Sequence, residues 1–309
     1  MDRNVVSLER LTYGNKGNRI MRDFEYECPR SLAEAVAVLG RLNGQARPLA
    51  GGTDLIDQIR IGRHSPSVVV DIKKLPELNV LEASASGLRL GAAVPCYRIY
   101  GCCDINRDYA ALADSARIIG GIQIQSRASV GGNLCNSGPA ADATPSLIAL
   151  GAVAVIAGPT GTRDVPVEDF CTGPGKNVLG PGELLVELKL PARPSKSGSH
   201  YRRFIPRNEM DIAVVGVGAS VVLDDAGEKF VSARIGLGAV APTPLFAKQA
   251  SNLLAGKVAN EKAFAAAAEA AQAIISPIDD MRGTKEFRLH VTGVLVRRVL
   301  EEAVKRARE

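Results

Sequence analysis

Two glycine-containing segments place the strongest constraint on how this chain can fold and what it can bind. In the first, a short apolar run ends at Gly51 and Gly52 and is followed by an expected helix. In the second, Gly131 and Gly132 lie among short hydroxyl and amide side chains. Because glycine has no Cβ atom, backbone N–H groups at such positions can approach an anion directly. Two such segments, about 80 residues apart, indicate a ligand with more than one phosphate, and a dinucleotide pyrophosphate fits best.

Two standard nucleotide-binding motifs do not account for these segments. Residues 236–241 match the letters of the dinucleotide fingerprint, but Pro242 and Pro244 stand where its helix would begin. Gly175 and Lys176 lack the earlier glycine of a P-loop. The two segments therefore predict phosphate binding outside both standard folds, with ordinary tight turns as the alternative.

Composition argues against several other classes of protein. The chain has 309 residues, 46% of them hydrophobic, which is enough for two domains or three small lobes. A net charge of +5, with scattered Lys and Arg, does not favour a nucleic-acid partner. No apolar run reaches the length of a membrane-spanning helix, and residues 1–20 carry charges rather than a signal sequence. We therefore expect a cytoplasmic protein with no integral membrane segment.

The cysteines and histidines do not predict a metal site in this chain. None of the six cysteines forms a C-x-x-C pair, and only Cys102 and Cys103 are adjacent. The three histidines stand outside any catalytic triad or zinc-protease motif. Reduced, partly buried thiols are the expectation.

The apolar periodicity predicts α/β lobes followed by an α+β domain. We expect an N-terminal extension at residues 1–20, a first lobe at 21–76, a second lobe at 77–192, a linker at 193–199 and a C-terminal domain at 200–309. The expected strands are 24–26, 47–50, 68–72, 87–94, 152–156, 184–190, 212–223 and 230–237. The expected helices are 32–42, 55–61, 109–119, 142–150, 245–254, 261–275 and 284–308.

Four motifs, in order along the chain, resemble those of the FAD-binding subunit of the molybdenum hydroxylases. They are AGGTDL at residues 50–55, ASVGGNL at 128–134, RNEMDIAVV at 207–215 and SPIDDMRGTKEFR at 276–288. This family includes the medium subunit of aerobic carbon monoxide dehydrogenase and the flavin domain of xanthine dehydrogenase. The resemblance runs from residue 21 to residue 305 and implies an α+β fold: a two-lobed vanillyl-alcohol-oxidase (PCMH)-type FAD-binding unit, then a C-terminal α+β domain that helps to cover the site.

The resemblance also implies a set of FAD-binding residues. The two glycine segments match those that hold the pyrophosphate and the adjoining sugar. Ile119, Gly121 and Leu185 match positions beside the isoalloxazine, and Arg203 matches a basic residue near the ring that would favour the anionic reduced flavin. The full set is Leu49, Ala50, Gly51, Gly52, Thr53, Asp54, Leu55, Ile119, Gly121, Ser129, Val130, Gly131, Gly132, Asn133, Asn136, Asp142, Leu185 and Arg203.

Several of these assignments have alternatives. Arg202 would replace Arg203 if the alignment shifts by one residue. Asp142 could instead cap the helix that follows it. Asp211, in the third motif, could be a site residue or a cap at the start of a strand. Cys135 is expected to be a small side chain near the FAD, because the segment leaves no room for the cysteine-rich insertion of 4-hydroxybenzoyl-CoA reductases.

By this resemblance the chain transfers electrons and has no catalytic side chain of its own. Its expected partners are a large subunit with a molybdenum cofactor and a small subunit with two [2Fe–2S] clusters, as a dimer of heterotrimers. The FAD would accept single electrons from the clusters and deliver electrons to NAD⁺, quinone or another acceptor. A stand-alone FAD-dependent oxidase or dehydrogenase and a cofactor-free assembly module are the alternatives.

Overall fold

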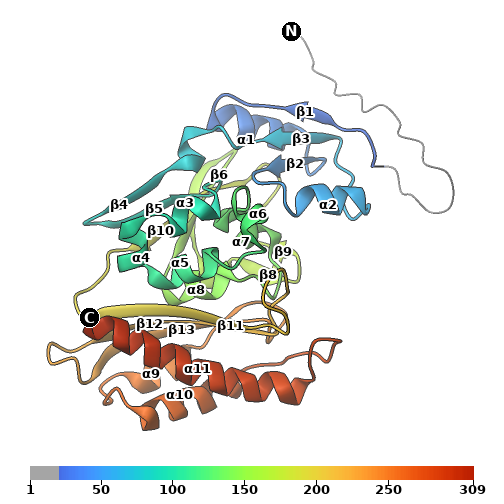
Figure 1. Ribbon diagram of the computed structural model, residues 1–309. Helices are drawn as coiled ribbons and strands as arrows, with labels where there is room; N and C mark the ends of the chain where they lie inside the picture. Colours follow the sequence, from blue (N-terminus) through green and yellow to red (C-terminus); the bar gives the residue numbers. More distant parts are fainter. Residues whose placement is uncertain (1–20) are drawn as a thin grey trace.

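The computed structural model describes residues 21–309, so the expected N-terminal extension over residues 1–20 lies outside the described residues. The described chain forms three stacked parts: a first lobe, a second lobe and a C-terminal domain (Figure 1). The expected α+β class is confirmed.

The first lobe is a small parallel sheet with two helices. It consists of β1 (Glu25–Glu27), α1 (Leu32–Arg41), β2 (Ala46–Leu49), α2 (Leu55–Arg60) and β3 (Val68–Asp71), with strand order β1-β3-β2. Both pairings are parallel, as expected for successive β-α-β units. All four residues of β3 are buried, which explains its run of valines in the centre of the sheet. The first glycine segment is the connection from β2 to α2.

The second lobe is an antiparallel sheet covered by short helices. Its sheet consists of β4 (Leu81–Ser84), β5 (Gly87–Gly91), β10 (Leu184–Pro191), β6 (Val153–Gly158) and β7 (Gly161–Pro166), in that spatial order. The helices are α3 (Cys96–Tyr100), α4 (Cys103–Asp108), α5 (Ala110–Ala116), α6 (Ile122–Gln125), α7 (Val130–Asn136) and α8 (Ala143–Ala149). A two-stranded ribbon of β8 (Cys171–Gly173) and β9 (Lys176–Asn177) completes the lobe.

One apolar cluster joins the two lobes. Val38 and Val70 of the first lobe are buried together with Leu184 and Val186 of β10. The lobes therefore share part of a core, which limits how far they can move relative to one another.

The C-terminal domain is an antiparallel sheet with three helices. It consists of β11 (Ser197–Phe204), β12 (Val215–Leu223), β13 (Phe230–Gly238), β14 (Leu245–Phe246), α9 (Lys248–Leu254), α10 (Glu261–Gln272) and α11 (Lys285–Arg308). The expected linker at 193–199 is too long, because β11 already begins at Ser197. The helix expected from residue 245 begins at Lys248, because Leu245 and Phe246 pair with β13.

The sheet of the C-terminal domain is covered on both faces. Helices α9 to α11 lie on one side, and α5 and α8 of the second lobe lie on the other (Figure 1). The approach of α8 is close: a Cβ atom on Gly236 would lie 2.3 Å from the carbonyl oxygen of Pro145. The second lobe and the C-terminal domain therefore pack as adjacent layers.

An ionic cluster holds the same interface at the C-terminal end of α5. The Oδ2 atom of Asp114 lies 2.6 Å from His200 Nδ1, and it accepts hydrogen bonds from Arg306 Nη1 at 2.7 Å and Tyr201 N at 3.2 Å. Burial would raise the pKa of Asp114, but the hydrogen bonds from His200 and Arg306 outweigh it and lower the pKa below its ordinary value.

This cluster predicts an acid-dependent loss of stability. A carboxyl group whose folded-state pKa is lowered contributes stability above its unfolded pKa of about 4, and loses it as the pH falls through the folded pKa. Asp114→Asn should lower the free energy of unfolding by about 2 kcal/mol at pH 7, and the difference from wild type should shrink below about pH 4. Urea denaturation at several pH values measures this.

The matched control is Asp104→Asn, since Asp104 forms an exposed pair with Arg107 at 2.9 Å. An exposed ion pair contributes little to stability, so the free energy of unfolding of this variant should differ from that of wild type by less than about 1 kcal/mol. A pH-independent effect of Asp114→Asn would contradict the assignment.

Candidate functional site

The two glycine segments, which belong to different lobes, lie directly against each other. A Cβ atom on Gly51 would lie 2.0 Å from the carbonyl oxygen of Arg127, just before the second segment. The Arg127 Nε atom donates a hydrogen bond of 3.0 Å to the carbonyl oxygen of Gly51. Glycine is therefore required at position 51 by the contact between two backbones.

A second bridge holds the segments in register. Gln58 of α2 donates from Nε2 to Oδ1 of Asn136 at the end of α7, at 2.8 Å. Each glycine segment leads into one of these helices. The bridge thus fixes the two helices, and with them the two segments, at a constant separation.

Unpaired backbone donors occur in both segments. Within residues 21–309, the amide N–H groups of Gly51, Gly52, Thr53 and Gly131 donate no hydrogen bond to a protein acceptor. An amide without a protein acceptor needs water or a ligand as acceptor. Grouped amides from two adjoining segments offer the donors that a pyrophosphate needs.

The structure accounts differently for the glycine at each of the four positions. Gly52 adopts a φ of +76°, which disfavours any side chain. A Cβ atom on Gly131 would lie 2.5 Å from the carbonyl oxygen of Ala92, so Gly131 permits close packing within the second lobe. A Cβ atom on Gly132 would meet only Ser129 Oγ, at 3.0 Å, within 4 Å. Ligand approach alone therefore does not explain Gly51 and Gly131, while Gly132 borders open space.

The polar side chains of the second segment cap its helices. Ser129 Oγ accepts from the amide of Gly132 at 3.0 Å and caps α7. Asn133 Oδ1 accepts from the amide of Ala143 at 3.1 Å and so satisfies the start of α8. Asp142 makes no capping hydrogen bond with its side chain. Asp142 therefore occupies the N-cap position of α8 as the alternative expects, but the side-chain acceptor at this end is Asn133 Oδ1.

Asp142 instead belongs to a buried cluster with two residues of β11. Its Oδ1 accepts from the Tyr201 hydroxyl at 2.9 Å, and its Oδ2 accepts from Arg203 Nη1 at 2.6 Å. Burial raises the pKa of the Asp142 carboxyl to about 6, although Arg203 and Tyr201 both favour the carboxylate. Burial and the neighbouring Asp142 raise the pKa of Tyr201 well above its ordinary value, so its hydroxyl stays a donor. Arg202 is exposed, and Arg203 is the arginine in the cluster.

The residues predicted beside the isoalloxazine lie at the inner side of the second lobe. Ile119 and Leu185 belong to its apolar core and are 8% and 1% exposed. Gly121 precedes α6 and adjoins the loop after β11, since a Cβ atom on it would lie 3.1 Å from Met210 Sδ. This loop of the C-terminal domain therefore reaches the second lobe beside Gly121.

Asp211 holds this loop together and does not cap a strand. Its carboxylate accepts from the amide of Ile212 at 2.8 Å and pairs with Arg207 at 3.4 Å and Arg282 at 3.9 Å. Strand β12 begins only at Val215. Asp211 thus joins the third and fourth sequence motifs, to which Arg207 and Arg282 belong.

Three residues of this region have no role in the sequence-based prediction. They are Tyr201, Gln58 and Arg288. Arg288 is 3% exposed and donates to the carbonyl oxygens of Val214 and Ala239 and to Asp280, at 2.6, 3.1 and 2.8 Å. A signal existed for Arg288 alone, because it ends the fourth sequence motif, whereas no strand was expected at Tyr201.

The thiols near the site are protonated. Burial raises the pKa of Cys135 to about 12, which leaves no reactive thiolate at neutral pH. Among residues 21–309, no group of three or more His, Cys, Asp or Glu side chains could hold a metal ion. No helix in the described part of the chain is long and apolar enough to cross a membrane.

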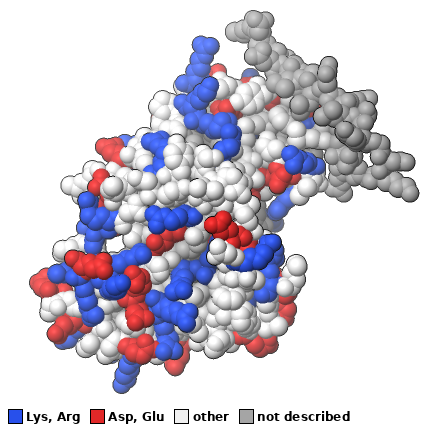
Figure 2. All heavy atoms as spheres, in the orientation of Figure 1, with Lys and Arg blue, Asp and Glu red and all other residues white. Residues whose placement is uncertain are grey.

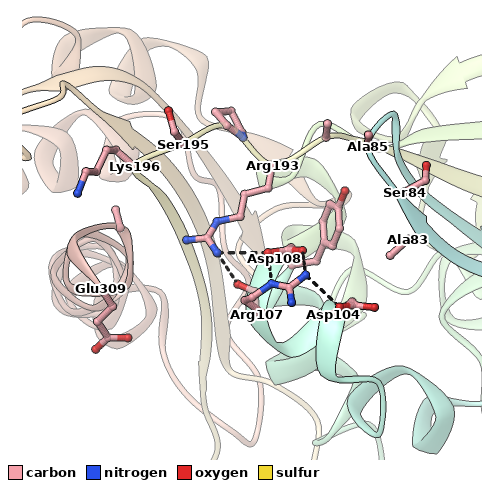
Figure 3. Close-up of a pocket in the computed structure, with 14 residues that line it drawn as sticks. Ala83, Ser84, Ala85, Asp104, Arg107, Asp108, Arg193, Ser195, Lys196 and Glu309 are labelled. Atoms are coloured by element: carbon pink, nitrogen blue, oxygen red, sulfur yellow. Dashed lines mark hydrogen bonds and ion pairs between the residues drawn. The ribbon is translucent and has the colours of Figure 1, made fainter.

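A cavity of about 570 Å³ lies away from the glycine segments, between α4, residues 192–196 and the end of α11. Four of its charged residues pair with one another: Arg107 with Asp104 and Asp108, and Arg193 with Asp108 at 3.3 Å (Figure 3). None of the predicted FAD-binding residues lines it. The cavity therefore lies at the junction between the second lobe and the C-terminal domain.

Two family models match the chain. Residues 22–193 match the FAD binding domain in molybdopterin dehydrogenase, and residues 200–303 match the CO dehydrogenase flavoprotein C-terminal domain. This chain belongs to the molybdenum hydroxylase family, as a FAD-binding subunit. The resemblance of the four motifs is thereby confirmed, and the chain is an FAD-binding oxidoreductase subunit.

Individual relatives of this family agree with the match. The chain is 34% identical to the carbon monoxide dehydrogenase medium chain of Afipia carboxidovorans, over 92% of this chain and 98% of that one. It is 35% identical to the xanthine dehydrogenase FAD-binding subunit of Escherichia coli O157:H7, over 92% and 97%. Among solved structures, CO dehydrogenase from Oligotropha carboxidovorans superposes with a TM-score of 0.89 at 32% identity, covering 93% of this chain and 99% of that one. Quinoline 2-oxidoreductase from Pseudomonas putida 86 gives 0.86 at 30% identity, covering 94% and 100%.

The contact at Gly51 predicts that an alanine at this position lowers stability more than an alanine at a glycine without such a contact. In Gly51→Ala, the new methyl group would overlap the Arg127 carbonyl, so the first lobe must shift away from the second. We expect a loss of about 2–3 kcal/mol in the free energy of unfolding and faster limited proteolysis of the first lobe. Gly173→Ala is the control, since its methyl group would meet only the Lys176 side chain, at 3.8 Å. Equal stability of the two variants would contradict the contact.

Proposed function

We propose that this chain binds FAD at the two glycine segments and transfers electrons through it within a molybdenum hydroxylase complex. The observation that carries the proposal is the contact between two segments of different lobes that together hold four unpaired amide N–H groups. A single turn would offer fewer donors than a pyrophosphate accepts. The family match supplies the identity of the cofactor.

The binding residues in this proposal are those named from the sequence. Residues 49–55 and 129–133 would hold the pyrophosphate and its sugar. Ile119, Gly121 and Leu185 would lie along the isoalloxazine. Asn136 and Asp142 would support the site through the hydrogen bonds described above, and Arg203 would lie near the flavin ring. The division into lobes at 21–76 and 77–192, followed by a C-terminal domain that begins with β11 at Ser197, belongs to the same proposal.

FAD supplies the redox chemistry, because it can accept and deliver either one or two electrons. The chain's own residues bind and enclose it. The unpaired amides bind the phosphates without a charged side chain, and the apolar core around Ile119 and Leu185 keeps water from the inner side of the site. The loop held by Asp211 reaches the second lobe from the opposite domain. No acid–base side chain of this chain is needed for electron transfer.

The proposed partners are a large subunit with a molybdenum cofactor and a small subunit with two [2Fe–2S] clusters, as a dimer of heterotrimers in the cytoplasm. The relatives named as medium chains and FAD-binding subunits support a multisubunit enzyme. The proposed final acceptor is NAD⁺, quinone or another acceptor. Basic and acidic side chains are interspersed over the described part of one face, which does not favour a polyanion such as nucleic acid as a partner (Figure 2).

The experiment compares two alanine variants of one segment. Gly132→Ala places a methyl group beside the open space at the second segment, whereas a Cβ atom on Gly138 meets nothing within 4 Å. Purified wild-type protein should bind about one FAD per chain, and Gly132→Ala should weaken FAD binding at least about tenfold, or about 1.4 kcal/mol. Gly138→Ala should bind FAD as wild type does. Fluorescence titration measures the affinities, and circular dichroism checks the fold.

Two results would contradict the proposal. One is wild-type protein that takes up no FAD after reconstitution. The other is protein that turns over an organic substrate without partner subunits, which would indicate a stand-alone oxidase or dehydrogenase.

A further inference from the structure

The buried cluster of Asp142, Tyr201 and Arg203 connects the second lobe to the C-terminal domain. Asp142 precedes α8, whereas Tyr201 and Arg203 lie on one face of β11. Both carboxylate oxygens are used, one by the tyrosine hydroxyl and one by the guanidinium. The side chains of Arg203 and Asp142 are only 5% and 10% exposed. Such pairs are costly to bury, so their hydrogen-bond geometry matters.

Arg203 uses few of its hydrogen-bond donors. Within residues 21–309, the only hydrogen bond of its side chain is the one from Nη1 to Asp142. A guanidinium has five N–H groups, and a buried one without acceptors costs free energy. Among residues 21–309, the fully enclosed side-chain N and O atoms without a hydrogen-bond partner are Thr144 Oγ1, Ser146 Oγ and Arg288 Nε. No atom of Arg203 is among them, so its unpaired N–H groups are not fully enclosed. Arg203 therefore has free donors beside accessible space.

The cluster is attached to the second glycine segment. Asn133 of that segment accepts from the amide of Ala143, the residue after Asp142. The position of Asp142 is thus set by the segment that would hold the pyrophosphate. The free donors of Arg203 lie on the strand paired to β12, next to the loop that reaches Gly121.

We propose that Asp142 and Tyr201 are positioning residues for Arg203: they fix its guanidinium so that the free N–H groups face acceptor atoms of the flavin ring, and the carboxylate offsets part of the arginine charge there. This inference rests on the proposed function. Asp142 then acts on the flavin through Arg203 and not by direct contact. Tyr201 supplies the second hydrogen bond that holds the carboxylate in place.

The proposal predicts how charge at the cluster changes the redox equilibrium of FAD. Asp142→Asn keeps the shape and removes the negative charge, so the arginine charge acts in full on the ring. Positive charge favours the anionic reduced flavin. We expect reduced FAD to be favoured over oxidised FAD by about tenfold more than in wild type, which for a two-electron couple is a rise of about 30 mV in midpoint potential. Arg203→Gln should shift the potential in the opposite direction.

The decisive test is a double-mutant cycle in the full chain loaded with FAD, with potentials measured by spectroelectrochemistry. Without Arg203, burial keeps Asp142 protonated and neutral, so Asp142→Asn should change nothing in the Arg203→Gln background. Tyr201→Phe, which leaves the charges in place, should shift the potential in the direction of Asp142→Asn by a smaller amount. Tyr201→Phe also tests the positioning role if Asp142→Asn does not fold.

The outcomes separate this inference from the proposed function. Wild-type protein that takes up no FAD overturns both. Wild-type protein that binds FAD, while Asp142→Asn or Tyr201→Phe leaves the potential unchanged, overturns only the positioning role. An equal shift from Asp142→Asn with and without Arg203 also overturns it, because the effect would then not pass through the arginine.

Discussion

The contact of the Gly51 backbone with the Arg127 carbonyl is the constraint on which the rest of the structure depends. It brings together two segments that are remote in the sequence and that belong to different lobes, one built on a parallel sheet and one on an antiparallel sheet. Only glycine permits this approach, because a methyl group would overlap the opposite backbone. The contact, with the Gln58 to Asn136 hydrogen bond, places unpaired amides from both lobes next to each other.

The C-terminal domain is held against the second lobe by two ionic clusters and by close packing. The Asp114 cluster and the Asp142 cluster both lie where β11 meets the helices of the second lobe. In each, a carboxylate of the second lobe is bound by residues of the C-terminal domain. Because each carboxylate binds residues at fixed positions of β11, these clusters set the alignment of the domain. The loop around Asp211 follows from that alignment and lies beside Gly121.

Much of the fold could be predicted from the sequence, since the strongest periodic segments became the expected elements. The β-branched run at β3 and the three helices of the C-terminal domain are examples. Edge strand β7 was missed because most of its residues are exposed and carry no apolar pattern. The short helices α3 and α4 were missed because neither is long enough to show a helical repeat.

The site could be predicted less completely than the fold. The glycine segments were recognisable by composition, but the reasons for Gly51 and Gly131 come from contacts with distant backbones. The partners of Asp142 could not be found by spacing, because Tyr201 and Arg203 are brought to it by the packing of two domains. A residue before a helix resembles a cap in the sequence, whether or not a distant arginine binds it.

The central claim is that amides of both glycine segments bind one FAD together. Hydrogen–deuterium exchange of the purified chain, with and without saturating FAD, tests it most directly. The account predicts that exchange slows on FAD binding both at residues 51–53 and at residue 131. FAD binding that leaves either segment unchanged would contradict it.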